Sequence, residues 1–206
     1  NVHEREGEDK IIAFGSVKEK ELDEIYSSIG LLQQSIPGFR HFIAPRELHL
    51  AEIIERELSK TYSTTRYSKI KGGADNGADI VVVDTVGDLQ AIYGHSAIAF
   101  VGGSLAPYGG QNMLEPLFVG TPVLFGPFTD TFRDIAQTIL DRKAGFLVRT
   151  GKDIHDTIIR LLGDESLYTA TQKAGNDIVA QQTHVMKETA EIIMNCLSAR
   201  AVGKGS

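Results

Sequence analysis

The chain has 206 residues, enough for one large domain or two small ones, and with 42% hydrophobic and 23% charged residues it is typical of a soluble globular protein with a sizeable core. A net charge of −6 without any run of five like charges excludes a general nucleic-acid binder and argues against a binder of anionic membranes. The single cysteine, Cys196, excludes an internal disulfide and suits a reducing compartment, and no apolar stretch approaches the roughly 20 residues of a membrane span.

Short β-rich runs alternate with longer helical patterns, which is typical of a parallel sheet covered on both faces. The predicted strands are residues 10–14, 40–44, 80–83, 97–101, 122–125 and 145–148. The predicted helices are residues 17–34, 48–60, 87–93, 113–118, 130–140, 153–162, 166–180 and 184–199. The polar residues 61–79 predict an irregular strand and an exposed loop. The pattern as a whole predicts an α/β fold, with one Rossmann-like, doubly wound parallel sheet of about six strands.

In the last predicted helix, Val185, Thr189, Ile192 and Cys196 share one stripe. This stripe has two interpretations, packing on its own domain or contact with a partner domain. The abrupt entry into the first strand suggests a domain boundary within a longer protein.

In an open α/β sheet, ligands bind beyond the carboxyl ends of the strands, so the turns after the strands carry the functional hypotheses. After the first strand, Ser16 and Glu19 have the spacing of a capping box, and the Ser16 hydroxyl is expected to face the ligand edge. After the second, Pro45 fixes the turn and Arg46 offers a guanidinium for stacking or for holding a phosphate.

The turn after the third predicted strand contains Thr85, Gly87 and Asp88. Thr85 and Asp88 have the spacing of a second capping box. Gly87 would let the backbone approach a planar base. On its own this turn is better read as structural.

The fourth turn is the most informative segment, FVGGSLAPYGGQNMLEP, residues 100–116. Its glycines, including Gly109 and Gly110, allow close backbone approach, and a helix is expected to begin near Asn112. Free N–H groups at a helix start suit a phosphate, and Glu115 could accept hydrogen bonds from hydroxyl groups. Two simpler interpretations remain open, a glycine-rich connection without a ligand and an electrostatic cap at Glu115. The segment is neither a Walker A loop nor a dinucleotide-binding fingerprint.

The six histidines show no metal-ligand spacing, so the sequence predicts no metal site. No Cys–His cluster and no nucleophile elbow is present. His41, inside an apolar run, is predicted to be a strand residue with its hydrogen bonds satisfied.

Taken together, five segments resemble the C-terminal half of the 3-deoxy-D-manno-octulosonic acid (Kdo) transferases, which are inverting GT-B glycosyltransferases of lipopolysaccharide assembly. The segments are, in chain order, GSVKEKEL, APRE, VVDTVGDLQAIY, AFVGGSLAPYGGQNMLEP and GTPVLFGPFTDTFRDI. The resemblance is good over residues 11–140 and most specific over residues 84–127. It implies the C-terminal half of a GT-B fold.

The resemblance implies a nucleotide site for CMP in four turns. The residues expected in it are Ser16, Pro45, Arg46, Val86, Gly87, Asp88, Gly109, Gly110, Asn112, Met113, Leu114 and Glu115. Glu115 is expected to contact the ribose. Three positions that are often histidine in the family are Lys18, Glu47 and Gln111 here, and a typical Asn-Phe pair is Thr131-Phe132. These departures bear on the donor sugar more than on the nucleotide, so a variant donor sugar is conceivable.

The resemblance further implies a transfer of Kdo from CMP-Kdo to a lipid A precursor, without a cofactor, at the cytoplasmic face of the bacterial inner membrane. The catalytic base, the acceptor surface and the membrane anchor belong to the family's N-terminal domain. Residues 1–206 are therefore expected to form a single donor-binding domain that carries no catalytic residue, is soluble, and is inactive alone. Two alternatives remain, another GT-B enzyme that uses a UDP-linked sugar and a non-catalytic nucleotide-binding module.

Overall fold

The structure, a computed structural model, describes residues 10–202, with the backbone alone described for residues 184–202. Within these residues the chain forms one parallel sheet of seven strands, in the order β3-β4-β2-β1-β5-β6-β7. The strands are β1 (Ile11–Val17), β2 (Arg40–Pro45), β3 (Thr64–Arg66), β4 (Ile80–Val82), β5 (Ile98–Val101), β6 (Val123–Phe125) and β7 (Gly145–Leu147). All neighbouring strands are parallel. The doubly wound α/β fold predicted from the sequence is confirmed.

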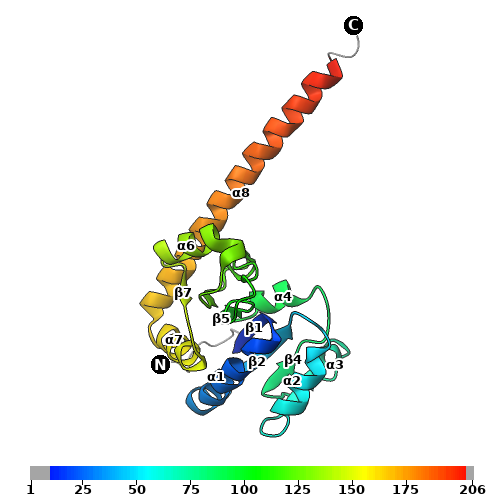
Figure 1. Cartoon of the computed structure of the whole chain (residues 1–206), viewed down its shortest axis with the longest axis vertical. Helices are drawn as coiled ribbons and strands as arrows, with labels where there is room; N and C mark the ends of the chain where they lie inside the picture. The colour runs from blue at the N-terminus through cyan, green and yellow to red at the C-terminus, as the bar shows by residue number, and fades with distance from the viewer. Residues whose placement is uncertain (1–9, 203–206) are drawn as a thin grey trace.

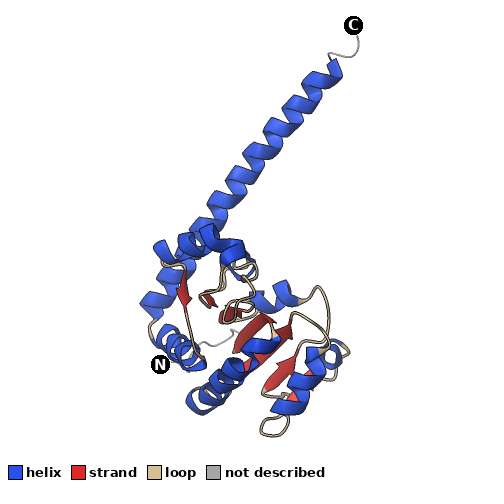
Figure 2. Ribbon diagram, viewed as in Figure 1, coloured by secondary structure: helices blue, strands red, loops and turns tan. Residues whose placement is uncertain are grey.

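Helices lie around the sheet, as Figure 2 shows. They are η1 (Glu19–Glu21), α1 (Leu22–Ser35), α2 (Leu50–Leu58), α3 (Tyr67–Lys71), α4 (Leu89–Gly94), α5 (Leu114–Phe118), η2 (Asp130–Phe132), α6 (Arg133–Asp141), α7 (Gly151–Gly163) and α8 (Glu165–Val202). Alternate strand residues point to opposite faces, so the sheet has a core on each side. One core contains residues of α1, α2 and α7, and the other contains residues of α4, α5 and α6.

Helix α8 is continuous over 38 residues, and Figure 1 shows it projecting from the body of the domain. The prediction of two helices, at 166–180 and 184–199, is wrong in this respect. The intervening Gln181, Gln182 and Thr183 include neither glycine nor proline, so nothing in the sequence breaks the helix. The predicted stripe from Val185 to Cys196 lies outside the residues whose side chains the structure describes.

Other differences from the prediction are local. Residues 61–79 contain the short edge strand β3 and the short helix α3. Helix α5 begins at Leu114, with Met113 as its N-cap residue, within two residues of the start predicted near Asn112. Over the described residues, no helix has both the length and the apolar character that crossing a membrane requires.

The central strands β1 and β5 are adjacent, although β2, β3 and β4 lie between them in the sequence. On one side of β1 the chain forms β2, the edge strand β3 and then β4 between them, and from β5 onward it extends the sheet on the other side. Such a point of reversal is where open α/β sheets leave a crevice beyond the carboxyl ends of the strands. Ser16 in β1 and the glycine-rich loop after β5 meet at this crevice.

Candidate functional site

A cavity of about 350 Å³ lies at the carboxyl ends of the central strands. Residues from all four of the predicted turns line it, together with Phe132 of η2. The lining residues are Ser16, Ala44, Pro45, Arg46, Leu48, Val83, Thr85, Val86, Gly87, Leu89, Gln111, Asn112, Glu115 and Phe132. The fold thus brings together segments that are up to about a hundred residues apart in the sequence.

Seven of the predicted nucleotide-binding residues line this cavity: Ser16, Pro45, Arg46, Val86, Gly87, Asn112 and Glu115. Asp88, Gly109, Gly110, Met113 and Leu114 do not line it. Their predicted roles in ligand binding stay predictions.

The residues outside the lining have identifiable contacts. Asp88 accepts hydrogen bonds from Lys71 at 2.8 Å and from the Thr85 hydroxyl at 2.6 Å. These two donors lower the pKa of the Asp88 carboxyl, Lys71 more than Thr85. The Met113 side chain is fully buried in the core on the α5 side of the sheet. Asp88 and Met113 therefore stabilise the shape of the turns behind the cavity.

Ser16 has a positive φ of 55°, which is uncommon for a residue other than glycine. It lies where the register between β1 and β2 is irregular, between Gly15 and Val17. The predicted capping box with Glu19 is wrong, because the turn that follows has Lys18 as its N-cap residue and Glu21 as the reciprocal acceptor. The distorted backbone brings Ser16 to the cavity instead of to a helix end.

Arg46 and Glu115 supply the opposite charges of the cavity. Partial burial raises the pKa of the Glu115 carboxyl, whereas the positive charge of Arg46 and the Asn112 side chain lower it. A carboxylate in this position can accept hydrogen bonds from hydroxyl groups, and the guanidinium can pair with a phosphate.

The glycine-rich loop between β5 and α5 has two different halves. In the first half, the N–H groups of Gly103, Ser104 and Leu105 donate to the Glu21 carboxylate at 2.7, 2.8 and 2.7 Å. These N–H groups are therefore occupied within the protein. The N–H of Gly102 is also occupied, because it donates to the Gly15 carbonyl oxygen at 2.8 Å.

In the second half of the loop, the backbone N–H groups of Gln111, Asn112 and Met113 have no hydrogen-bond acceptor within residues 10–202. The Asn112 side chain instead accepts the N–H of Leu114 at 3.1 Å. Three successive N–H groups of this kind can bind an anion. Helix α5 has only five residues, so its dipole adds little to them.

Sequence reasoning missed the apolar wall of the cavity, made by Leu48, Leu89 and Phe132. Leu48 is 46% exposed, and Val86, which also lines the cavity, is 82% exposed. Apolar side chains of this kind can contact one face of an aromatic base. The sequence gives only a weak signal for these apolar side chains. Leu48 and Leu89 lie close in sequence to the predicted site residues Arg46 and Asp88, and Phe132 lies in the segment GTPVLFGPFTDTFRDI that resembles the family.

The rim of the cavity carries an ion pair. Lys18 Nζ lies 3.0 Å from Glu47 Oε1 and 4.7 Å from the centre of the Tyr108 ring. The pair joins the turns after β1 and β2, and Tyr108 brings the glycine-rich loop against it. Lys18 and Glu47 are two of the three positions at which the sequence departs from the family histidines, and the structure pairs them.

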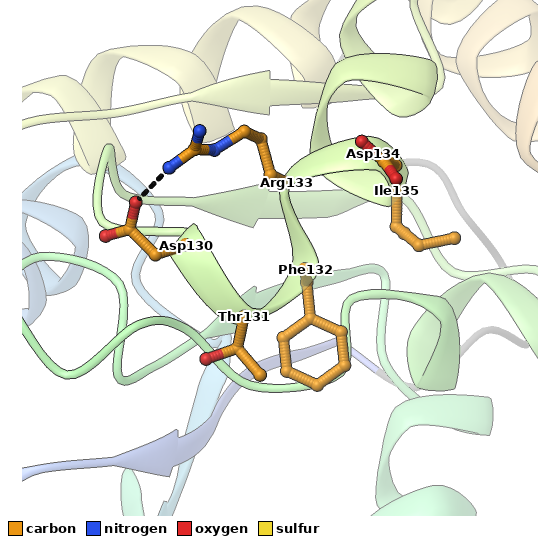
Figure 3. Close-up of a pocket in the computed structure, with 6 residues that line it drawn as sticks. All are labelled: Asp130, Thr131, Phe132, Arg133, Asp134 and Ile135. Carbon is orange, nitrogen blue, oxygen red and sulfur yellow. Dashed lines mark hydrogen bonds and ion pairs between the residues drawn. The ribbon is translucent and has the colours of Figure 1, made fainter.

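A second hollow, formed by residues 130–135 alone, opens on the surface beside η2 (Figure 3). Its two closest charges, Asp130 and Arg133, pair with each other at 2.7 Å and are largely exposed. Phe132 belongs to both hollows. Since one short segment forms it and its charges are already paired, we assign no ligand to this hollow.

Over the described residues, no group of three His, Cys, Asp or Glu side chains could hold a metal ion. His41 is fully buried, and neither of its ring nitrogens has a hydrogen-bond partner. His41 lies in strand β2 as predicted, but the prediction that its hydrogen bonds are satisfied is wrong. Burial lowers the pKa of this imidazole to about 4.

Two curated proteins illustrate the sequence similarity of this chain. The bifunctional glycosyltransferase/methyltransferase of Fusobacterium nucleatum is 38% identical over 144 residues, which are 69% of this chain and 22% of that protein. The 3-deoxy-D-manno-octulosonic acid transferase of Aquifex aeolicus is 27% identical over 154 residues, which are 74% of this chain and 42% of that protein. The chain thus spans less than half the length of either relative. No protein-family model matches it.

Among solved structures, the C-terminal CMP-Kdo binding domain of WaaA from Acinetobacter baumannii has a TM-score of 0.77 to this chain. It is 21% identical and covers 84% of this chain, while this chain covers 90% of that domain. The fold is accordingly that of the C-terminal half of a GT-B glycosyltransferase.

Within that class, the chain belongs to the family of the 3-deoxy-D-manno-octulosonic acid transferases. The family resemblance predicted from the five sequence segments is confirmed.

Proposed function

We propose that residues 1–206 are the donor-binding domain of an enzyme that transfers Kdo from CMP-Kdo to a lipid A precursor. The observation that carries the proposal is the cavity at the carboxyl ends of the central strands, which combines Arg46, Glu115 and the free backbone N–H groups of Gln111 and Asn112 with apolar side chains. This is the combination that a nucleoside monophosphate requires, with one group each for phosphate, ribose and base.

In this proposal the free N–H groups of residues 111–113 and the Arg46 guanidinium bind the phosphate of CMP. Glu115 accepts hydrogen bonds from the ribose hydroxyl groups. The base lies against Leu48, Leu89 and Phe132, beside the turn of residues 86–88. The similarity to a CMP-Kdo binding domain supports CMP as the nucleotide.

During transfer, the acceptor hydroxyl oxygen forms a bond to the anomeric carbon of Kdo. The bond between that carbon and the phosphate oxygen breaks, and its electron pair leaves with CMP. Donors already aimed at the phosphate stabilise the negative charge that grows on this leaving group. The acceptor proton passes to a base, which we expect in an N-terminal domain outside residues 1–206.

The same N-terminal domain would hold the lipid A precursor and attach the enzyme to the cytoplasmic face of the inner membrane. Under this proposal the chain alone binds the donor and transfers nothing. Adding the chain to CMP-Kdo and acceptor should release no CMP, whereas the protein extended by its N-terminal domain should release it.

Calorimetric titration with CMP, UMP and UDP tests the proposal. CMP should bind at least ten times more tightly than UMP, because only cytosine has an amino group to donate to the turn at residues 86–88. Equal affinity for CMP and the two uridine nucleotides would overturn the assignment to CMP-Kdo.

One observation favours a second candidate, a donor with a different sugar on the same nucleotide. The Lys18–Glu47 ion pair occupies positions where the family often has histidine, and it lies at the rim of the cavity. Competition between CMP-Kdo and other CMP-linked sugars for the titrated site would distinguish the two candidates.

A further inference from the structure

Glu21 is a fully buried carboxylate at the end of η1, between β1 and α1. Oε2 accepts the N–H of Lys18 at 2.9 Å and the N–H of Gly103 at 2.7 Å. Oε1 accepts the N–H of Ser104 at 2.8 Å and the N–H of Leu105 at 2.7 Å. One side chain therefore satisfies four backbone donors from two segments more than 80 residues apart.

A buried carboxylate is costly unless donors replace the water that it loses. Here four N–H groups do so, three of them successive in the chain. This is the geometry of an anion-binding turn, and the anion is the protein's own side chain. The positive φ of Gly103, 70°, is part of the turn that aims these groups at one point.

Backbone bonds connect the Glu21 carboxylate, through the loop after β5, to the residues that line the cavity. The Gly103 carbonyl accepts the N–H of Gly110 at 2.7 Å, so the two ends of the loop are joined. A Cβ built on Gly103 would lie 3.2 Å from the Gln111 side chain. Gln111 and Asn112 line the cavity, so Gly103 connects the Glu21 carboxylate to the part of the loop that faces the cavity.

The same carboxylate also fixes the opposite side of the cavity through Lys18. Lys18 follows Ser16 closely, and its ammonium group pairs with Glu47 at the rim. Glu21 thus joins the turn after β1 to the loop after β5, together with the bond from the Gly102 N–H to the Gly15 carbonyl and that from the Lys20 N–H to the Tyr108 hydroxyl. Of these contacts, only the Glu21 carboxylate accepts three successive N–H groups of the loop, those of residues 103–105.

We propose that Glu21 is a positioning residue for nucleotide binding, which holds the free N–H groups of residues 111–113 at the spacing that the phosphate requires. The proposal rests on the proposed function, because it takes CMP as the ligand. It assigns Glu21 no contact with the ligand, so its effect on binding is exerted through Gly103 and Gly110.

The test compares Glu21→Gln with Glu24→Gln. Glu24 is a matched control on the same segment, because its carboxylate accepts one distant backbone N–H, that of Gly151, and does not line the cavity. Glutamine keeps the size of Glu21 but turns an NH₂ group towards backbone donors. We expect CMP affinity to fall at least tenfold in Glu21→Gln and to stay within twofold in Glu24→Gln.

Thermal unfolding of both variants separates a positioning role from a loss of stability. Glu21→Asp keeps the charge, so it should bind CMP more tightly than Glu21→Gln even if the two variants have the same midpoint of thermal unfolding. Unchanged affinity in folded Glu21→Gln, or an equal loss in Glu24→Gln, would overturn the proposal.

Amide hydrogen exchange of the wild-type chain tests the same idea should Glu21→Gln fail to fold. The N–H groups of residues 103–105 should be protected without ligand, and those of residues 111–113 should gain protection only with CMP. Fast exchange of residues 103–105 in the free protein would contradict the proposal. Absence of any CMP binding, with residues 103–105 protected, would instead refute the proposed function and leave the anchoring by Glu21 intact.

Discussion

Gly102 and Gly103 pack against the protein's own backbone and carboxylate, whereas Gly109 and Gly110, later in the same loop, lead directly to the open N–H groups of residues 111–113. A Cβ on Gly102 would lie 2.6 Å from the Ser16 carbonyl oxygen. At Gly109 the nearest atom would be the Thr131 hydroxyl, on a side chain that can move. Gly102 and Gly109 therefore serve different purposes, the first to close the fold and the second to shape the loop that leads to the site.

The largest expected effect tests this difference directly. Gly102→Ala should lower the free energy of unfolding by about 3 kcal/mol or more, since the added methyl group meets backbone that cannot yield. Gly109→Ala should cost about 1–2 kcal/mol, the cost of a left-handed backbone conformation for alanine. Urea denaturation of both variants measures the two values, and equal losses would mean that the pairs are not distinct.

Acidification should lower the free energy of unfolding through His41, which is independent of both glycine pairs. The pKa of His41 is lowered to about 4 by burial, against an ordinary value of 6.5, so the unfolded chain takes up a proton first as the pH falls. The stability contributed by neutral His41 is complete above pH 6.5 and is lost between pH 6.5 and 4. The loss should reach about 3 kcal/mol at about 1.4 kcal/mol for each pH unit.

His41→Leu is the matched variant for this experiment. It removes the proton-binding group, so the difference in unfolding free energy between wild type and variant should depend on pH only in that window. A difference that is constant from pH 7 to pH 4 would show that His41 is not the group that titrates.

Glu115→Ala tests whether the second half of the loop, which leads to the free N–H groups of residues 111–113, binds the ligand. Loss of a charged hydrogen-bond acceptor should weaken CMP binding by about 1–3 kcal/mol. Glu115→Gln, which keeps an acceptor oxygen, should lose less. Calorimetry measures both values, and unchanged affinity with an intact fold would make Glu115 only a helix cap.

The smallest effect is expected at the rim. Exchanging the charges in the double variant Lys18→Glu, Glu47→Lys should change stability by less than about 1 kcal/mol, because both side chains are partly exposed. Binding of CMP should be nearly unchanged, while discrimination between CMP-linked sugars should change. Identical sugar preference in the wild-type and exchanged proteins would exclude the ion pair as a specificity determinant.

The sequence predicted the parts of the fold that depend on local pattern. Short apolar runs such as residues 97–101 are typical of strands that are buried on both faces of a parallel sheet, so these strands were evident in the sequence. Strand β3, with only the polar residues Thr64–Arg66, is stabilised by pairing with β4 and has no apolar signal of its own. The four turns of the site were predictable because strand ends in a parallel sheet share one edge.

The remaining features of the site depend on contacts between distant residues. Glu21 looks like an ordinary first-turn glutamate in the sequence, and its partners at residues 103–105 become evident only in three dimensions. The same holds for Phe132, whose exposure to the cavity depends on where η2 packs. His41 was misjudged for the same reason, since strand pairing satisfies its backbone and leaves the imidazole to its surroundings.

The adjacency of β1 and β5 also governs when the site forms during folding. Strand β1 can pair with β2 early, because about thirty residues separate the paired positions. Its contact with β5, and the bonds from Glu21 to the loop, must wait until a segment of more than 80 residues has closed. Closing long loops costs entropy before any contact compensates for it, so such contacts form late. The cavity is therefore a marker of completed folding, and a chain that has formed only its first strands cannot yet hold a nucleotide.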